Sequence, residues 1–436
     1  MTTTETPGTV GTNWAGNVEY AARELLEPTS VDELRAAVTA HPQVTALGSR
    51  HSFNRIADTD AVQVSLARMP GTVDVDGERS VARVAAGLTH ARVAAALDAA
   101  GYALPNLASL PHISVAGAVQ TGTHGSGVRN PSLASSVVGL EIVRADGTLD
   151  VVGDTAGGHA ERDGSAGPSD ELDAHRVGIG ALGIVTAVHL AVEPSFEVAQ
   201  TIHTGLSWDA VDAGFEDIMS AGYSVSMFTG FTDDGIRQVW TKRRTDRDDP
   251  VVDLEALGAR PSTSPLHPVP GSEAAGVTEQ GGVPGPWFER LPHFRSSFTP
   301  SNGAEIQCEY LLPVADAVPA IHALRAIADR LAPVLFVSEI RRIAADTAWL
   351  APSSGRDSVA FHFTFRRDTE GVAAVLPLID EALAPFDARP HWGKVTSMTS
   401  GRLHEVYPKL ADFTAVADRV DPGGRFRNAF LRDLLG

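Results

Sequence analysis

The sequence predicts an α+β protein with two domains, and three observations support this fold class. A chain of 436 residues is long enough for two hydrophobic cores. Short apolar or alternating segments fill the chain up to about residue 193, and longer helices and strands follow from about residue 200. Hydrophobic residues make up 43% and charged residues 20%, as in ordinary globular proteins. We expect domains at 1–195 and 196–394, with 395–436 packing back near the first domain.

Local signals define the elements of the first domain. Val31 to Val38 has the period of a helix with Thr29 or Ser30 as its N-cap, and Thr89 caps a second helix. Asp146-Gly147 is a strong hairpin signal. Short apolar or alternating runs predict strands at 44–47, 62–66, 81–86, 137–143, 148–152 and 184–192.

The second domain has longer periodic segments. Helices are expected at 211–219 and 318–331, and strands at 306–312, 334–340 and 359–365. Pro261 to Pro286 holds six prolines and five glycines in 26 residues, which predicts an excursion or lid rather than a core element. Thr155 to Asp170 is expected to be a shorter loop of the same kind.

Charge and cysteine content exclude several classes of function. The formal net charge of −19 repels phosphate backbones, so nucleic acid is not an expected partner. Cys308 is the single cysteine, which excludes an intrachain disulfide and a multi-cysteine metal site, and no metal is expected. Met1 to Tyr20 lacks the pattern of a secretory signal, and no apolar run reaches the roughly 18 to 20 residues that span a bilayer. We therefore expect a cytoplasmic protein without a membrane partner.

One glycine motif resembles a dinucleotide-binding fingerprint. Gly178 to Gly183 reads G-x-G-x-x-G, and Glu197 lies near the expected downstream acid. A Rossmann motif must open a helix so that free N–H groups meet the pyrophosphate. The residues that follow alternate as a strand instead, which argues against a Rossmann site.

Two other segments are better candidates for binding a phosphate. They are Gly48 to Asn54, which reads GSRHSFN, and Gly117 to Gly127, which reads GAVQTGTHGSG. Glycine and small hydroxylated residues let backbone N–H groups approach an anion closely. The alternative interpretation is that both are tight surface loops.

These segments resemble the FAD domain of the vanillyl-alcohol oxidase superfamily, and the match extends through Asn106 to Gly117 into the C-terminal half. The resemblance implies an FAD-binding domain of two α+β subdomains and a substrate domain with a mixed or antiparallel sheet flanked by helices. In its alditol oxidase branch, the residue matching His51 is linked covalently to the flavin. The implied FAD contacts are Gly48, Ser49, Arg50, His51, Ser52, Ser109, Ser114, Gly117, Ala118, Thr121, Gly122, Thr123, His124, Gly125, Ile184, His391 and Lys394.

Three predicted strands alternate polar and apolar residues, so each places its polar side chains on one face. Such a pattern fits a solvated sheet face, or a face that binds a ligand with several hydroxyl groups. The resemblance to alditol oxidases favours the second reading and implies polyol-binding residues at Ser109, Gln307, Glu339, Arg341, His362, Thr364 and Lys394. The segment His391 to Lys394 is shared with aldonolactone oxidases, so it indicates the wider group. Ala108 leaves room near the flavin.

The resemblance implies oxidation of a terminal CH₂OH of a polyol such as xylitol, with dioxygen reduced to hydrogen peroxide. With an ordinary pKa of about 6.5, His362 is the expected base, whereas Arg341 stays protonated and stabilises the alkoxide. Lys394 places positive charge near the flavin, and Glu339 orients Arg341 and accepts a substrate hydroxyl. The alternative in which Arg341, or a water it holds, takes the proton stays open.

Two other functions remain possible from the sequence. One is an aldonolactone oxidase or dehydrogenase of the gulonolactone type, and the other is a sugar-binding protein that keeps the fold without turnover. Nothing in the sequence indicates an obligate oligomer, so a monomer is expected.

Overall fold

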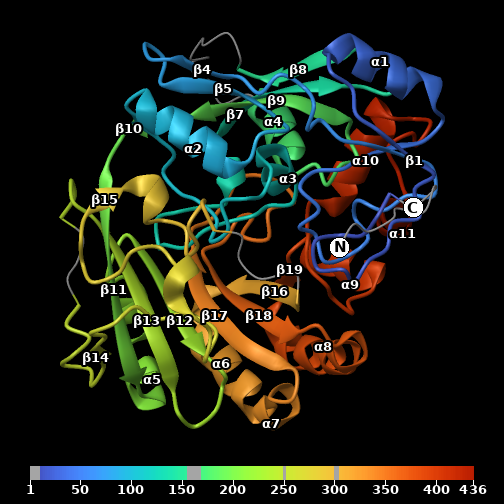
Figure 1. Ribbon diagram of the computed structural model, residues 1–436. Helices are drawn as coiled ribbons and strands as arrows, with labels where there is room; N and C mark the ends of the chain where they lie inside the picture. Colours follow the sequence, from blue (N-terminus) through green and yellow to red (C-terminus); the bar gives the residue numbers. More distant parts are fainter. Residues whose placement is uncertain (1–9, 155–167, 249–251, 299–303) are drawn as a thin grey trace, which may run out of the picture.

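The computed structural model describes residues 10–154, 168–248, 252–298 and 304–436. Two smaller sheets lie above one large sheet in Figure 1, and the last helices of the chain return to the side of the smaller sheets. The expected loop at 155–170 falls mostly outside the described residues, but its last residues begin helix α4 (Pro168–Arg176).

The first small sheet is parallel, and we call it the parallel sheet. Its described strands are β1 (Glu24–Leu26), β2 (Val44–Ala46) and β3 (Val62–Val64), in the order β1-β3-β2. Helix α1 (Val31–Ala40) buries Leu34 and Val38 against these strands, and Ser30 caps it by accepting a hydrogen bond from the Glu33 amide. The helix and its N-cap are therefore as predicted.

The second small sheet is antiparallel and lies beside the first. Its described strands are β4 (Val73–Asp76), β5 (Val81–Ala85), β9 (Ile184–Ala191), β7 (Val137–Val143) and β8 (Leu149–Gly153), in that order. The strands β7 and β8 pair as the predicted hairpin, and Gly147 adopts the positive φ of +82° that its turn requires. Nearby elements are α2 (His90–Ala99), β6 (Tyr102–Ala103), α3 (Val115–Gln120), a 3-10 helix at Leu133–Ser136, and β10 (Glu193–Pro194).

The large sheet is antiparallel throughout its described strands. The order is β14 (Arg260–Pro261), β11 (Glu197–Leu206), β13 (Ile236–Arg244), β12 (Ser224–Thr229), β17 (Leu335–Ile343), β18 (Ser358–Arg366), β16 (Glu305–Pro313) and β19 (Arg389–Pro390), with β15 (Gly285–Pro286) also on β11. Its helices are α5 (Trp208–Met219), α6 (Ala317–Ala326), α7 (Ala328–Leu331) and α8 (Thr369–Leu383), along the lower side in Figure 1. Short 3-10 helices lie at Ala274–Gly276, Trp287–Glu289, Val314–Asp316 and Ala384–Phe386.

One predicted helix differs from the structure. The expected helix at 318–331 is divided at Ile327, whose φ of −110° and ψ of 8° leave the α region. Strands β11, β12 and β13 and helix α8 were not predicted.

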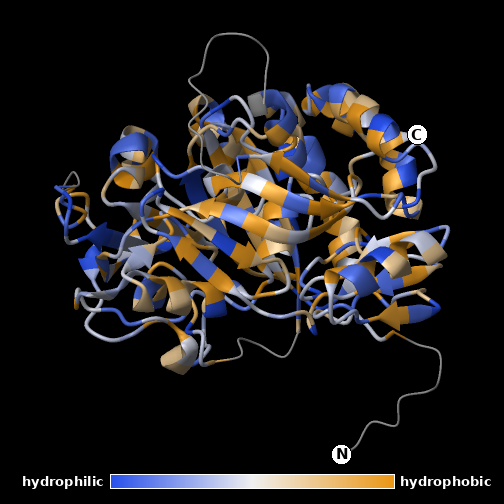
Figure 2. Ribbon diagram, turned by 90° about the horizontal axis from the view of Figure 1, so that it is seen from above, coloured by the Kyte–Doolittle hydropathy of each residue, from blue (hydrophilic) through white to orange (hydrophobic). Residues whose placement is uncertain are grey.

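The two faces of the large sheet have opposite chemistry. Phe361, Phe363 and Phe365 of β18 pack into one hydrophobic cluster with α5, α6 and α8. Between them, His362 and Thr364 point to the other face, as the period of two requires. Hydrophobic and hydrophilic residues alternate along several strands in Figure 2. The helices therefore cover the apolar face, and the polar face lies opposite the two small sheets.

The C-terminal segment lies against the parallel sheet. It contains α9 (Ser400–Val406), α10 (Leu410–Val420) and α11 (Ala429–Leu435). The Val44 amide donates to the Arg425 carbonyl at 2.9 Å, and the Asn428 side chain donates to the carbonyls of Ile56 and Asp58. These bonds join the end of the chain to residues 44–58. The domain boundaries stay predictions.

Within residues 10–154, 168–248, 252–298 and 304–436, no helix is long and apolar enough to cross a membrane.

Candidate active site

A cavity of about 530 Å³ lies between the polar face of the large sheet and the two small sheets. This volume is within the range of ordinary small-molecule sites. The predicted site residues that line it are Gly48, Ser49, Arg50, His51, Ser52, Ser109, Ser114, Gly117, Ala118, Thr121, Thr123, His124, Ile184, Gln307, Glu339, Arg341, His362, Thr364, His391 and Lys394. The structure therefore brings the two predicted groups, from both halves of the chain, into one cavity.

Gly122 and Gly125 are the two predicted cofactor residues that do not line the cavity. A Cβ on Gly125 would lie 2.4 Å from the Leu107 carbonyl oxygen, and a Cβ on Gly122 would lie 2.9 Å from a carbon of Pro352. Both positions therefore need glycine for close packing behind the wall, which corrects their expected place at its surface.

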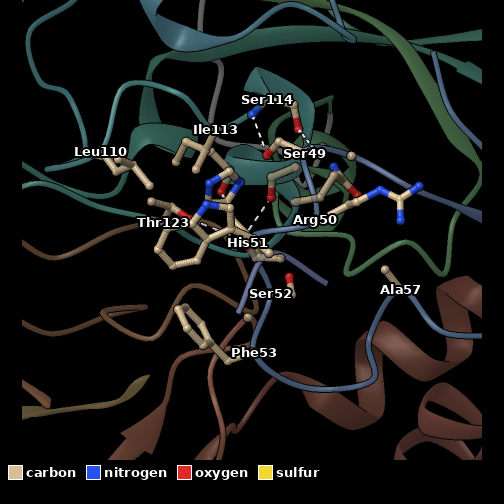
Figure 3. Close-up of a pocket in the computed structure, with 18 of the residues that line it drawn as sticks. Ser49, Arg50, His51, Ser52, Phe53, Ala57, Leu110, Ile113, Ser114 and Thr123 are labelled. Carbon is tan, nitrogen blue, oxygen red and sulfur yellow. Dashed lines mark hydrogen bonds between the residues drawn. The ribbon is translucent and has the colours of Figure 1, made fainter. Parts of the chain in front are cut away.

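The two glycine-containing segments are held together by a pair of serines. The Ser114 amide donates to Ser49 Oγ at 3.0 Å, and the Ser49 amide donates to Ser114 Oγ at 3.4 Å (Figure 3). A Cβ on Gly48 or Gly117 would lie 2.6 or 2.7 Å from Ser114 Oγ. The glycines thus allow both segments to meet and leave space in front of them.

His51 presents an imidazole in the cavity wall. Its Nδ1 is buried and has no hydrogen-bond partner among the described residues. Burial lowers the pKa of His51 to about 4, so the ring is neutral at neutral pH. A neutral imidazole has a lone pair on one ring nitrogen and is able to form a covalent bond to an electrophile.

The loop around His51 is tied to the loop that carries Lys394. The Asn54 side chain donates to the carbonyls of Trp392 and Lys394, both at 2.8 Å. The Phe53 amide donates to the Gly393 carbonyl at 2.7 Å. The predicted covalent residue and the predicted cation are therefore held on adjoining loops.

Polar side chains of the large sheet form two rows across neighbouring strands. His362 is paired in register with Glu309 of β16 on one side and with Glu339 of β17 on the other. In the next row, Thr364 is paired with Gln307. The grouping of polar residues on one face, predicted from their spacing, is therefore confirmed.

A buried arginine joins two carboxylates in this face. Arg341 is hydrogen-bonded to Glu309, and its Nε lies 3.7 Å from Glu339 Oε1. Burial alone would raise the pKa of each carboxyl, but the charge of Arg341 holds both pKa values well below the usual range. Glu309 and Glu339 are therefore both ionised, and the expected partnership of Glu339 with Arg341 is present.

The expectation of an ordinary pKa for His362 is wrong. Burial lowers the pKa of its ring to about 3, although the charge of Glu309 opposes this shift. The ring is therefore neutral throughout the pH range in which a free histidine titrates.

A chain of hydrogen bonds defines which nitrogen of His362 carries hydrogen. Lys394 Nζ donates to Gln307 Oε1, because an ammonium has only donors. His362 Nε2 lies 3.1 Å from the same oxygen and must donate to it. The lone pair of His362 is therefore on Nδ1.

Lys394 is a cation at the junction of the two walls. It lies over the Phe53 ring, 4.7 Å from its centroid. Burial lowers the pKa of Lys394 to about 8, so the ammonium form prevails at neutral pH.

Several lining residues were missed by the sequence analysis. The alternation that identified Gln307 also indicates Glu309, two residues further on the same strand. Trp14 comes from the N-terminal part of the chain and Phe228 from strand β12. Others come from the segment expected to be an excursion or lid and from the residues that follow it; they include His267, Pro268, Val269, His293 and Phe294. The irregular backbone of that segment has no period that could have predicted which of its side chains face the cavity.

The glycine motif at Gly178 to Gly183 opens strand β9, as predicted, and not a helix. Ile179, Gly180 and Gly183 nevertheless line the cavity. The motif therefore belongs to the wall of the site without the geometry of a Rossmann turn.

Comparison with known proteins identifies the family. Residues 22–153 match the family model described as an FAD binding domain, and residues 301–434 match that of D-arabinono-1,4-lactone oxidase. The alditol oxidase of Streptomyces sp. (strain IKD472 / FERM P-14339) is 49% identical, over 98% of this chain and 99% of that protein. The chain belongs to the alditol oxidase family.

Members of other families are more distant. The L-gulono-1,4-lactone dehydrogenase of Mycobacterium tuberculosis is 26% identical over 98% of this chain and 99% of that protein. Cholesterol oxidase from B. sterolicum has a TM-score of 0.73 at 13% identity, covering 98% of this chain and 97% of that chain, which shows a shared fold. The alditol oxidase is therefore more similar in sequence to this chain than the other two proteins are.

The cavity residues fit the FAD that the matching domain binds. Gly48 and Gly117 leave an open cradle in which a Cβ would meet Ser114, and backbone N–H groups of such turns suit a diphosphate. His51 Nδ1 is buried without a hydrogen-bond partner in the described chain, which fits an atom whose partner is a bound cofactor. Ala108 also lines the cavity, in keeping with the space expected there.

Proposed function

We propose that this protein is an FAD-dependent oxidase that converts the terminal primary hydroxyl of an alditol to the aldose and reduces dioxygen to hydrogen peroxide. The observation that carries the proposal is the arrangement of the cavity. One wall is a glycine and serine cradle, and the other is a sheet face that presents Gln307, Glu339, Arg341, His362 and Thr364. A flexible ligand with several hydroxyl groups needs that density of donors and acceptors.

The proposal places FAD against the cradle, bonded covalently to His51. Bound there, FAD would take a hydride from the substrate carbon and pass the electrons to dioxygen. The Nδ1 atom of His51 is the candidate for the bond, because it is neutral and has no hydrogen-bond partner in the described residues. A covalent bond would prevent loss of the cofactor.

In the proposed reaction, the protein binds the polyol through charged and neutral groups. The ionised Glu339 accepts a hydrogen bond from a substrate hydroxyl, and Ser109, Gln307 and Thr364 bind the remaining hydroxyls. Arg341 and Lys394 supply positive charge where the alkoxide develops. The cost of burying these charges is offset because Arg341 is paired with Glu309 and Glu339.

We assign proton acceptance to the Nδ1 atom of His362. The terminal carbon loses a hydride, the O–H bond breaks, and its proton moves to that lone pair while the carbonyl forms. Burial lowers the pKa of His362 to about 3, so the ring is unprotonated at neutral pH but is a weak base. Its role therefore depends on the negative charge of Glu309, which stabilises the imidazolium that forms.

A lactone oxidase is the competing function, because residues 301–434 match the D-arabinono-1,4-lactone oxidase model. Peroxide formation with xylitol, sorbitol, glycerol and L-gulono-1,4-lactone distinguishes the two. We expect peroxide with the polyols and a much slower reaction with the lactone. Turnover of the lactone alone would assign the protein to the competing function. We further propose that the protein is a monomer and that it acts in the cytoplasm.

A further inference from the structure

A lysine is buried on the same face of the large sheet as Glu339, outside the lining of the cavity. Lys242 of β13 is only 1% exposed. Its Nζ is hydrogen-bonded to the Leu291 carbonyl and donates to the Pro292 carbonyl at 3.1 Å and to His293 Nδ1 at 3.2 Å. Burial lowers the pKa of this amine to about 7. A buried charge is costly unless it is used or well paired.

The ring of His293 connects this lysine to the cavity. Its Nε2 lies 2.8 Å from Glu339 Oε1, and both residues are buried. Glu339 is ionised and can only accept, so Nε2 of His293 carries the hydrogen of this bond. Burial lowers the pKa of His293 to about 4, so the ring is neutral and its Nδ1 accepts from Lys242. Hydrogen is therefore on Nε2, and the Nε2–H group donates to the Glu339 carboxylate.

Aromatic side chains hold the plane of the His293 ring. Trp240 and Phe228 approach it with centroid distances of 5.0 and 5.6 Å, both at an interplanar angle of 64°. The His293 amide also donates to the carbonyl of Ser109, on the opposite wall of the cavity, at 3.0 Å. The ring can therefore transmit an orientation from Lys242 to Glu339.

We propose that His293 and Lys242 are positioning residues that orient the Glu339 carboxylate for a substrate hydroxyl. Lys242 donates to Nδ1 of His293 and so stabilises the tautomer with hydrogen on Nε2, and His293 occupies one side of the carboxylate. The remaining lone pairs of Glu339 are thereby directed to the polyol and to Arg341. This inference rests on the proposed function, because it assigns the polyol as the partner of Glu339.

Two polar substitutions of His293 separate orientation from simple packing. In His293→Asn the amide replaces Nδ1 and still meets Lys242, but it is too short to reach Glu339. In His293→Gln the amide reaches the position of Nε2 and restores a neutral N–H donor to Glu339. His189→Asn is the matched control, because His189 forms a similar buried pair with Glu141, at 3.1 Å, outside the cavity.

Rapid anaerobic mixing with xylitol measures the dissociation constant and the limiting rate of flavin reduction separately. We expect His293→Asn to raise the dissociation constant on the order of 10- to 100-fold, as for a lost hydrogen bond to a charged group. The limiting rate should change less. His293→Gln should restore most of the affinity, and His189→Asn should leave both constants unchanged.

Lys242 is tested through a double-mutant cycle. Lys242→Met should weaken xylitol binding in the unmodified background and have no further effect in His293→Asn, because its influence passes through His293. Additive effects would overturn the role of Lys242. Equal affinity in the Asn and Gln variants of His293 would overturn the role of His293. If xylitol fails to reduce the flavin of the unmodified protein, the proposed function fails instead.

Discussion

Trp14 stacks on His51, with ring centroids 5.2 Å apart and planes inclined by 23°. The Trp14 amide donates to the Arg50 carbonyl at 2.8 Å, and the Asn13 side chain donates to the Ser52 carbonyl at 2.9 Å. The residues on both sides of His51 are thus held by an earlier part of the chain. This contact limits the directions in which the imidazole can present Nδ1.

The stacking leads to a prediction about the covalent bond. Trp14→Ala should lower the fraction of flavin that stays with the polypeptide after acid precipitation, because the free ring no longer holds its reactive orientation. His51→Ala should retain no flavin, and Trp349→Ala, which alters a partly buried tryptophan outside the cavity, should retain it fully. Complete release of flavin from the unmodified protein would disprove the bond to His51.

Lys394 should impose a pH limit on the reaction. Burial lowers its pKa to about 8, so its charge is present below that pH and is lost above it. The rate of flavin reduction by xylitol should fall as pH rises through about 8. Lys394→Met should still bind FAD, reduce it on the order of 10²-fold more slowly and lack this alkaline limb. An unchanged reduction rate in the variant would remove Lys394 from the mechanism.

The low pKa of His362 determines how the rate of flavin reduction should depend on pH before and after this residue is substituted. The rate of flavin reduction should show no titration of His362 between about pH 5 and pH 7, because burial lowers the pKa of that ring to about 3. His362→Ala should lower the rate on the order of 10²- to 10⁴-fold at every pH in that range. A limb near pH 6.5 that disappears in this variant would instead support the ordinary pKa.

Arg341 is tested in the same assay. Arg341→Ala should slow flavin reduction on the order of 10²- to 10³-fold, as for a lost oxyanion donor. The variant also leaves Glu309 and Glu339 facing each other without their shared cation. A normal rate in Arg341→Ala would exclude alkoxide stabilisation by this residue.

His90 gives a test of stability away from the reaction. It is 2% exposed, neither ring nitrogen has a hydrogen-bond partner in the described chain, and burial lowers its pKa to about 4. As the pH falls, His90 is protonated at about pH 6.5 in the unfolded chain but only at about pH 4 in the folded protein. Protonation of His90 therefore leaves the free energy of unfolding unchanged above about pH 6.5 and lowers it progressively between about pH 6.5 and pH 4. His90→Leu should reduce the loss of unfolding free energy between about pH 7 and pH 4.5 by about 2 to 3 kcal/mol. Denaturant unfolding at both pH values measures it, and an unchanged difference would contradict the prediction.

The sequence predicted which polar side chains share a sheet face, because the alternation of side chains along a strand depends only on neighbouring residues. Alternation in β18 requires His362 and Thr364 to share a side, and the same rule places Glu339 with Arg341. Register between strands is a tertiary property, so the pairing of Glu309 with His362 could not be predicted from either strand.

The charge states of the site residues depend on how deeply each is buried, which only the complete fold determines. An ordinary pKa was assigned to His362 because burial cannot be read from a strand that alternates, and the structure lowers that pKa to about 3. The role of Lys242 was equally hidden, because its partner His293 follows an irregular segment with no period. Gly122 and Gly125 were assigned to the cavity from the family resemblance, and the residue type could not correct this because close packing and anion binding both select glycine.

Anaerobic addition of xylitol to the purified yellow protein, followed by air, tests the central claim most directly. We expect xylitol to bleach the flavin absorbance, and air to restore it with one hydrogen peroxide formed for each aldose. The same addition of L-gulono-1,4-lactone should bleach the flavin far more slowly. A flavin that stays oxidised with xylitol and is bleached by the lactone, or a purified protein without flavin colour, would contradict the account.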